Sequence, residues 1–202
     1  MVPGIRRTRT RMALRKALPG VVMIALIVVG AAPASGQGTF GADVLFGPVF
    51  GVQQARGADR AEVTGGIALR SRLVPLFGIE GAVQYRQEDY GDGAVTVRAW
   101  PVTLSGLVYL APSVCAVGGG GWYHATFDYD ESLGLEDRTQ STRDFGWHVG
   151  AGVEYALGSS TTLVADARYV FLDYAFQEVP GLHEEASNFY VVSAGLLFGL
   201  TR

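Results

Sequence analysis

Residues 144–157 read DFGWHVGAGVEYAL, and apolar side chains occupy every second position of this stretch. The apolar series runs from Phe145 to Leu157, whereas the positions between them carry small residues or polar ones such as His148 and Glu154. Successive side chains of a β-strand point to opposite faces. The pattern therefore predicts a strand with one apolar and one polar face.

The same alternation recurs along the chain, and in residues 161–173 the charged Asp166 and Arg168 share one face. No segment after residue 35 shows a sustained helical period, so the chain is predicted to be all-β. Eight strands are predicted, at residues 41–53, 62–73, 77–87, 94–109, 114–127, 144–157, 161–173 and 188–200. Pro48 and Pro101 lie within two of them, which predicts bulges or register faults at both positions.

The links between the predicted strands alternate in length. The short links are residues 74–76, 110–113 and 158–160, and the longer polar links are residues 54–61, 88–93, 128–143 and 174–187. Consecutive links of an up-and-down meander lie at opposite ends of the sheet, so all the long links are expected at one end. Outer-membrane barrels have this arrangement, with short periplasmic turns and longer external loops.

Residues 1–34 are predicted to be a secretory signal peptide. Six arginines and lysines precede or flank the apolar run 21–29, and small residues follow up to Ala34, where we expect cleavage. A single membrane anchor is the alternative, but its strongly apolar centre is short for a bilayer span. The remainder, residues 35–202, is expected to be one barrel domain.

Composition excludes several classes of protein. Of 16 lysines and arginines, six precede residue 35, so ten remain against 19 acidic residues, a net charge of −9. This charge disfavours nucleic acid as a partner, because phosphate binding needs clustered cations. The single cysteine, Cys115, cannot form an intrachain disulfide. No motif predicts a cofactor or a structural metal site.

Alternation alone does not separate a membrane barrel from a soluble lipocalin-type barrel. The polar face, however, is crowded with small residues, since Gly146, Gly150 and Gly152 share it with Glu154. The interior of an eight-stranded barrel is just wide enough for side chains, so long charged residues there need small neighbours. This predicts that the polar face lines the interior and that the apolar face contacts lipid.

Aromatic residues cluster near the predicted strand ends, as expected for the two girdles of a membrane barrel. Those toward the short links are Phe77, Tyr109, Tyr155 and Phe198, and those toward the long links are Tyr85, Phe127, Phe145, Trp147, Phe171 and Tyr190.

The last strand ends in AGLLFGL at residues 194–200, which resembles the C-terminal signal of bacterial outer-membrane barrels. Together with residues 145–155 and 165–169, it makes residues 40–202 similar to the small outer-membrane β-barrel family that includes the OmpX-like and OmpA-like barrels. The resemblance implies a closed eight-stranded antiparallel up-and-down transmembrane β-barrel in the outer membrane of a Gram-negative-type bacterium. It also implies contact with outer-membrane lipid and lipopolysaccharide, and assembly by the barrel-assembly machinery through the C-terminal strand.

Charges on the inner face of such a barrel need partners, because a buried unpaired ion costs several kcal/mol. We therefore predict a filled lumen that is crossed by an ionic network. The residues predicted to belong to this interior polar network are Arg70, Glu80, Arg86, Arg98, His148, Glu154, Asp166 and Arg168.

A structural or surface-interaction role is the leading function, with loops that meet an extracellular ligand the sequence does not identify. A narrow pore or transporter for small solutes is one alternative. A lipid A-modifying enzyme is another; its candidate residues would be His124, His183, Ser132, Ser141 and Ser187, which no sequence motif joins.

Two further motifs have simple explanations. The carboxylates of residues 128–131 lack the spacing of a calcium-binding loop and are expected to form a solvated acidic loop. The four glycines of residues 118–121 lack the lysine and the helix of a phosphate-binding loop, and they are expected to thin the barrel wall.

Overall fold

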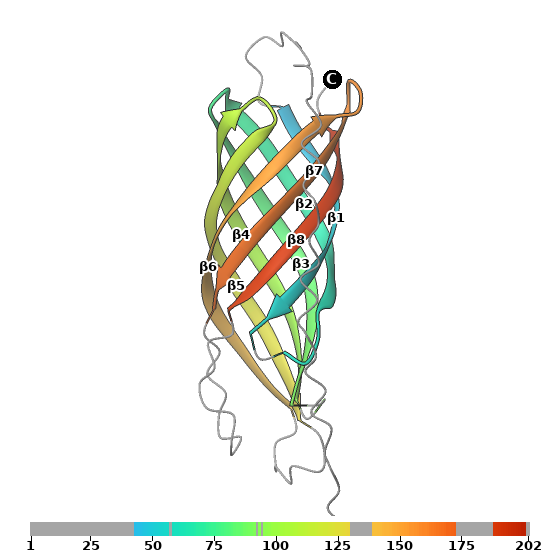
Figure 1. The fold of residues 1–202 in the computed structure, drawn as a ribbon, viewed down its shortest axis with the longest axis vertical. Coiled ribbons are helices and arrows are strands. Elements are labelled where there is room, and N and C mark those ends of the chain that lie inside the picture. Colours follow the sequence, from blue (N-terminus) through green and yellow to red (C-terminus); the bar gives the residue numbers. More distant parts are fainter. Residues whose placement is uncertain are drawn as a thin grey trace, which may run out of the picture. The chain divides into compact units, whose positions relative to one another are not determined.

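The computed structural model describes residues 43–56, 58–91, 93, 95–129, 139–172 and 188–200. These residues form a closed barrel of antiparallel strands in chain order, with the last strand pairing with the first (Figure 1). The strands are β1 (Asp43–Ala55), β2 (Glu62–Val74), β3 (Phe77–Tyr90), β4 (Val95–Ala111), β5 (Val114–Tyr129), β6 (Thr139–Ala156), β7 (Thr161–Phe171) and β8 (Phe189–Gly199). Closure leaves no strand edge unpaired, which lipid requires because it offers no hydrogen-bond partners.

The predicted strands and their order are confirmed. Figure 1 shows the three short turns together at the end of the barrel where β8 finishes, so the strand ends that the longer links join lie at the other end. The predicted signal peptide and the whole link at residues 174–187 lie outside the described residues. Among the described residues, none belongs to an apolar helix long enough to cross a membrane.

Strand length at the long-link end was underestimated. The predicted link at residues 128–143 is partly strand, because β5 continues to Tyr129 and β6 begins at Thr139. Likewise β3 continues to Tyr90. The β6 extension is polar at every position from Thr139 to Arg143, and Glu88 and Asp89 place a carboxylate on each face of β3. Without apolar alternation, these segments were assigned to loops.

The predicted register faults at the prolines were wrong. Pro48 pairs with Ile67, and Pro101 pairs with Tyr123, in uninterrupted register. Each proline lacks an N–H toward one neighbouring strand alone, so the ladder with the other neighbour stays intact. The register shifts instead occur beside the short turns, between Arg72 and Val74 in β2 and at the end of β4.

The face of the strands that carries polar residues changes along the barrel axis, although the inward and outward positions keep their parity. In the middle of β4, Leu104 is exposed on the outer wall and Ser105 is buried inside. Nearer the long-link end the polarity is reversed, since Arg98 faces outward whereas Val97 and Val95 are buried. The outward residues of β5 and β6 likewise become polar toward this end, at Thr126 and Asp128 and at Ser141 and Arg143. The inward residues are apolar on β4 and β5 but include Thr142 and Asp144 on β6. These strands therefore leave the lipid near Trp100 and Trp122 and continue as a water-exposed extension.

The outer wall carries an aromatic girdle near each end of its apolar band. Exposed aromatic residues toward the short-turn end are Phe46, Phe77, Tyr155 and Phe198, and those toward the other end are Trp100, Trp122, Phe145, Trp147, Phe171 and Tyr190, whereas Phe50 lies between the two groups. Tyr109 and Phe127, which were predicted to belong to the girdles, are buried inside the barrel instead. Their positions have the opposite parity to the outward series of β4 and β5.

Glycine on the inner wall makes room for large polar side chains. Gly119 faces His148 from the adjacent strand, and a Cβ atom at Gly119 would lie 2.9 Å from His148 Nε2 and overlap the carbonyl oxygen of Leu104. On the outer wall, a Cβ atom at Gly81 would meet nothing within 4 Å. A side chain therefore has no room at Gly119, whereas it has room at Gly81.

We expect Gly119→Ala to lower the free energy of unfolding by about 1–3 kcal/mol, the usual cost of overpacking a close-packed interior. Gly81→Ala is the matched control, and its effect should stay below about 1 kcal/mol. Equilibrium unfolding of the protein in lipid vesicles by guanidinium measures both. Equal effects of the two substitutions would show that the inner wall has room to spare at Gly119.

Candidate functional site

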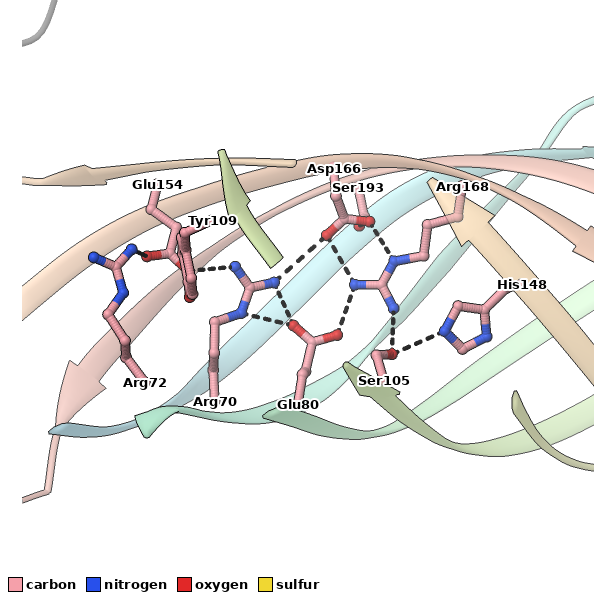
Figure 2. Close-up of polar contacts among 10 residues, drawn as sticks. All are labelled: Arg70, Arg72, Glu80, Ser105, Tyr109, His148, Glu154, Asp166, Arg168 and Ser193. Atoms are coloured by element: carbon pink, nitrogen blue, oxygen red, sulfur yellow. Dashed lines mark hydrogen bonds and ion pairs between the residues drawn. The ribbon is translucent and has the colours of Figure 1, made fainter. Parts of the chain in front are cut away.

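The middle of the barrel interior holds a cluster of charged side chains from several strands. Arg70 of β2 is directly opposite Glu80 of β3 in the strand register, and both side chains are buried, at 2% and 3% exposure. Asp166 and Arg168 extend inward from β7 two residues apart, as the alternation of a strand requires. Figure 2 shows these side chains converging from opposite walls of the barrel.

Glu80 links the two arginines. Arg70 donates to Glu80 Oε2 from both Nε, at 2.9 Å, and Nη2. Arg168 Nη2 donates to the other carboxylate oxygen of Glu80 at 2.6 Å. Arg168 also donates to Asp166 through Nε at 2.8 Å, and Ser193 of β8 donates to the same Asp166 oxygen at 3.1 Å. Both oxygens of each carboxylate thus have charged partners or hydroxyl donors.

The network continues toward the short-turn end through Glu154 of β6. Its carboxylate accepts hydrogen bonds from Arg70 at 2.8 Å, from Arg72 at 3.1 Å and from the Tyr109 hydroxyl at 2.7 Å. The Arg72 guanidinium also lies 3.5 Å from the centroid of the Tyr109 ring and donates to the Pro112 carbonyl at 3.2 Å. Tyr109 and Arg72 therefore close the network next to the short turns (Figure 2).

The network as a whole carries no net charge. It holds three arginines, Arg70, Arg72 and Arg168, against three carboxylates, Glu80, Glu154 and Asp166. Charge equality matters here because each ion has lost most of its water, and the attraction between opposite charges must offset that loss.

His148 and Ser105 form a buried pair beside Arg168. Ser105 Oγ lies 2.8 Å from His148 Nε2, and Arg168 Nη1 donates to Ser105 Oγ at 3.3 Å. A serine beside a histidine is the arrangement of a nucleophile and its base. Their exposure of 1% and 2% places the pair inside the packed interior, where a substrate would have to displace the ionic network.

A small cavity separates this network from the long-link end of the lumen. Its volume is about 20 Å³, and Gln53, Arg86, His148, Arg168 and Ser193 are among the residues that line it. A volume of this size holds about one water molecule. The cavity therefore does not form a passage through the barrel.

The lumen beyond the cavity is closed by a second layer of side chains. Arg86 forms an ion pair with Glu88, and its guanidinium lies 3.7 Å from the centroid of the Phe189 ring. Tyr90 donates to Glu88 at 2.9 Å. Buried apolar residues fill the space around them, and this cluster is Ala55, Tyr90, Val95, Val97, Ala99, Tyr123, Ala125, Phe127, Tyr129, Val170, Leu172, Phe189 and Val191.

The structure places seven of the eight predicted network residues inside the barrel. Arg70, Glu80, Glu154, Asp166 and Arg168 are joined directly. His148 joins them through Ser105, and Arg86 belongs to the second layer.

The prediction for Arg98 was wrong. Its side chain is half exposed on the outer wall, where Nε donates to Asp128 of β5 at 2.9 Å. Arg98 lies in the extension beyond the membrane, where the polar face is the outer one. Sequence patterning assumed a single polarity along the whole of β4.

Sequence reasoning missed the partners that complete the network, namely Arg72, Ser105, Tyr109 and Ser193. Each has the inward parity of its strand, so extending the alternation of β2, β4 and β8 identifies them. Tyr109 was excluded because an aromatic residue near a strand end was assigned to the girdle.

The residues considered for lipid A chemistry do not form a site among the described residues. His124 and Ser141 are exposed on the outer wall, on adjacent strands. Ser132, His183 and Ser187 lie outside the described residues. The same is true of Asp130 and Glu131 of the acidic segment, whereas Asp128 belongs to β5 and pairs with Arg98.

The closed barrel, the lipid-facing apolar band with its girdles and the buried ionic network define a small transmembrane β-barrel. Residues 20–197 match the outer membrane protein β-barrel domain family. The chain belongs to this family.

Solved structures with the same fold share little sequence with the chain. Neisserial surface protein A has a TM-score of 0.56 at 17% identity, with 78% of this chain and 98% of that chain covered. Ail, the attachment invasion locus protein of Yersinia pestis, has a TM-score of 0.49 at 13% identity, covering 79% and 97%. The N-terminal barrel domain of Pseudomonas aeruginosa OprF has 0.49 at 11% identity, covering 79% and 100%. No curated protein matches the sequence.

The buried network predicts a strong and non-additive response to mutation. Arg70→Met leaves Glu80 and Glu154 short of one partner each, and we expect the free energy of unfolding to fall by about 3–5 kcal/mol. The double variant Arg70→Met/Glu80→Gln should lose less than the sum of its single variants by at least about 1 kcal/mol. Guanidinium unfolding in lipid vesicles measures this coupling.

The exposed pair provides the control. Arg98→Gln removes an arginine that also bonds a carboxylate, but solvent screens that pair, so the loss should be below about 1 kcal/mol. If Arg70→Met were as mild as Arg98→Gln, the interior charges would be hydrated, and the account of a dry, charge-balanced lumen would fail.

Proposed function

We propose that this chain is a non-conducting, non-enzymatic outer-membrane protein whose barrel anchors surface loops for interaction with extracellular molecules. The observation that supports this most directly is the filled lumen. Ion pairs and apolar side chains occupy it from the Glu154 level to the Phe127 level, with a cavity of about 20 Å³ between the two layers.

The filled lumen argues against the pore as an alternative. A solute would have to break Arg70, Glu80 and Arg168 apart, and each opened pair leaves an ion without its partner in a low-dielectric interior. Packing of this kind keeps the lumen closed to solutes. The same packing argues against enzyme chemistry at the buried Ser105 and His148 pair, since the cavity beside His148, about 20 Å³, is too small for a substrate.

The long-link end is the part of the chain suited to contacts outside the membrane. Outer-membrane barrels expose their longer loops to the exterior. Residues 130–138 carry four acidic side chains against Arg138, so this segment suits basic partners or divalent cations that bridge to lipopolysaccharide.

We expect purified protein in planar bilayers to show no large, steady conductance, because the ionic network and the apolar layer block the lumen in series. The measurement is single-channel recording at both voltage polarities, with a porin reconstituted identically as the positive control. Liposome swelling with small sugars tests uncharged solutes in parallel. Steady conductance from monomeric protein would refute the anchor proposal in favour of a pore.

Replacement of residues 130–138 by a Gly-Ser segment of equal length should leave the barrel intact, because the segment lies beyond the ends of β5 and β6. Heat-modifiable migration on gels checks the barrel. In cells that express the two forms, the replacement should reduce adhesion or alter envelope permeability. Unchanged adhesion and unchanged permeability would argue against a role for this segment.

A further inference from the structure

A group of aromatic and cationic side chains lies on the outer wall where β4, β5 and β6 leave the lipid. Trp100 of β4, His124 of β5 and Arg143 of β6 are consecutive partners in the strand register, and Trp122 lies two residues from His124 along β5. We name these four residues the β4–β6 ledge. All four side chains are exposed, with Trp100 at 56% and Trp122 at 48%.

The ledge has its aromatic part toward the lipid and its polar part toward water. Beyond it in β5 the outward residues are Thr126 and Asp128, whereas on its other side the outward position is the glycine Gly120. Tryptophan rings concentrate at the level of lipid headgroups. The ledge therefore lies at the headgroup level of the leaflet on the long-link side, which is the outer leaflet for a barrel of this class.

The guanidinium N–H groups of Arg143 are available to a ligand at this level. Its guanidinium lies 5.3 Å from the centroid of the Trp122 ring, and it forms no ion pair with any residue that the structure describes. The nearby Arg98, by contrast, is held by Asp128. Directly opposite residues on paired strands have Cβ atoms roughly 5 Å apart, so His124 and Arg143 can reach one anion together.

We infer that the β4–β6 ledge binds a phosphate group of lipid A in the outer leaflet. The Arg143 guanidinium matches two phosphate oxygens with its parallel N–H groups, the His124 imidazole donates a further hydrogen bond, and the tryptophans contact the lipid below. A phosphate monoester offers more charge and more acceptors than the diester of a phospholipid, which favours lipid A as the source. The inference depends on the position of the ledge at the membrane surface, and it is independent of whether the lumen conducts.

Binding can be measured by native mass spectrometry on the full chain refolded in maltoside micelles and titrated with bis-phosphorylated lipid A. Dephosphorylated lipid A and phosphatidylglycerol are the comparison lipids. We expect Arg143→Gln to weaken binding of the bis-phosphorylated form about fivefold, the effect of one interfacial arginine. His124→Gln should weaken it in the same direction.

Arg56→Gln is the matched control, because Arg56 is an exposed arginine at the same end of the barrel but follows β1, away from the ledge. This variant should bind lipid A like the unmodified protein. Arg143→Lys keeps the charge without the fork and should show an intermediate loss. Heat-modifiable migration establishes that each variant is folded, which is expected since these side chains face away from the interior.

Three results would overturn the inference. Unchanged binding by both Arg143→Gln and His124→Gln would exclude the ledge as the site. An equal loss in Arg56→Gln would indicate attraction by overall charge. Equally tight binding of phosphatidylglycerol or of dephosphorylated lipid A would show that the ledge does not select the lipid A phosphate.

Discussion

The shared position of Glu80 between two arginines is the interaction on which the barrel interior depends. Arg70 and Arg168 come from opposite walls, and Glu80 brings both into one network by offering one carboxylate oxygen to each. The arrangement ties β2, β3 and β7 across the lumen, whereas backbone hydrogen bonds tie neighbouring strands alone. Because the dielectric constant of the interior is low, such a network stabilises the fold when every charged group is paired and destabilises it when one group loses its partner.

The small residues of the inner wall follow from this network. A narrow barrel that encloses three arginines and three carboxylates has space only for small side chains at its other inward positions. Gly119 is an example, since even a methyl group there would press on His148. The glycine content that first indicates a β structure is therefore linked to the charges that the barrel encloses. Without the small residues of the inner wall, the barrel could not enclose these charged side chains.

Strand number, order and facing were predictable from the sequence because period-two alternation is strong wherever one face meets lipid. Arg98 and Phe127 were not predictable by the same rule. Arg98 and Phe127 lie in the extension, where water replaces lipid outside and apolar side chains replace ions inside, so the same parity has the opposite chemistry. Tyr109 follows the rule, since it has inward parity, but as an aromatic residue near a strand end it was assigned to the girdle. Its hydrogen bond to Glu154 is a contact between strands that no local pattern records.

The inversion of polarity also explains why the two ends of the barrel differ. At the short-turn end the strands stop close to the lipid boundary, and the interior there is closed by Glu154, Arg72 and Tyr109. At the other end β4, β5 and β6 continue past the boundary, and the inward side chains of β4 and β5 there, such as Val95, Val97 and Phe127, belong to the apolar cluster that closes the lumen. Side chains buried against this cluster do not need lipid to cover them, so the barrel wall extends beyond the membrane surface. The loops are therefore attached to a fixed support in water, and residues at its base, such as Arg143, are held at the height of the lipid headgroups.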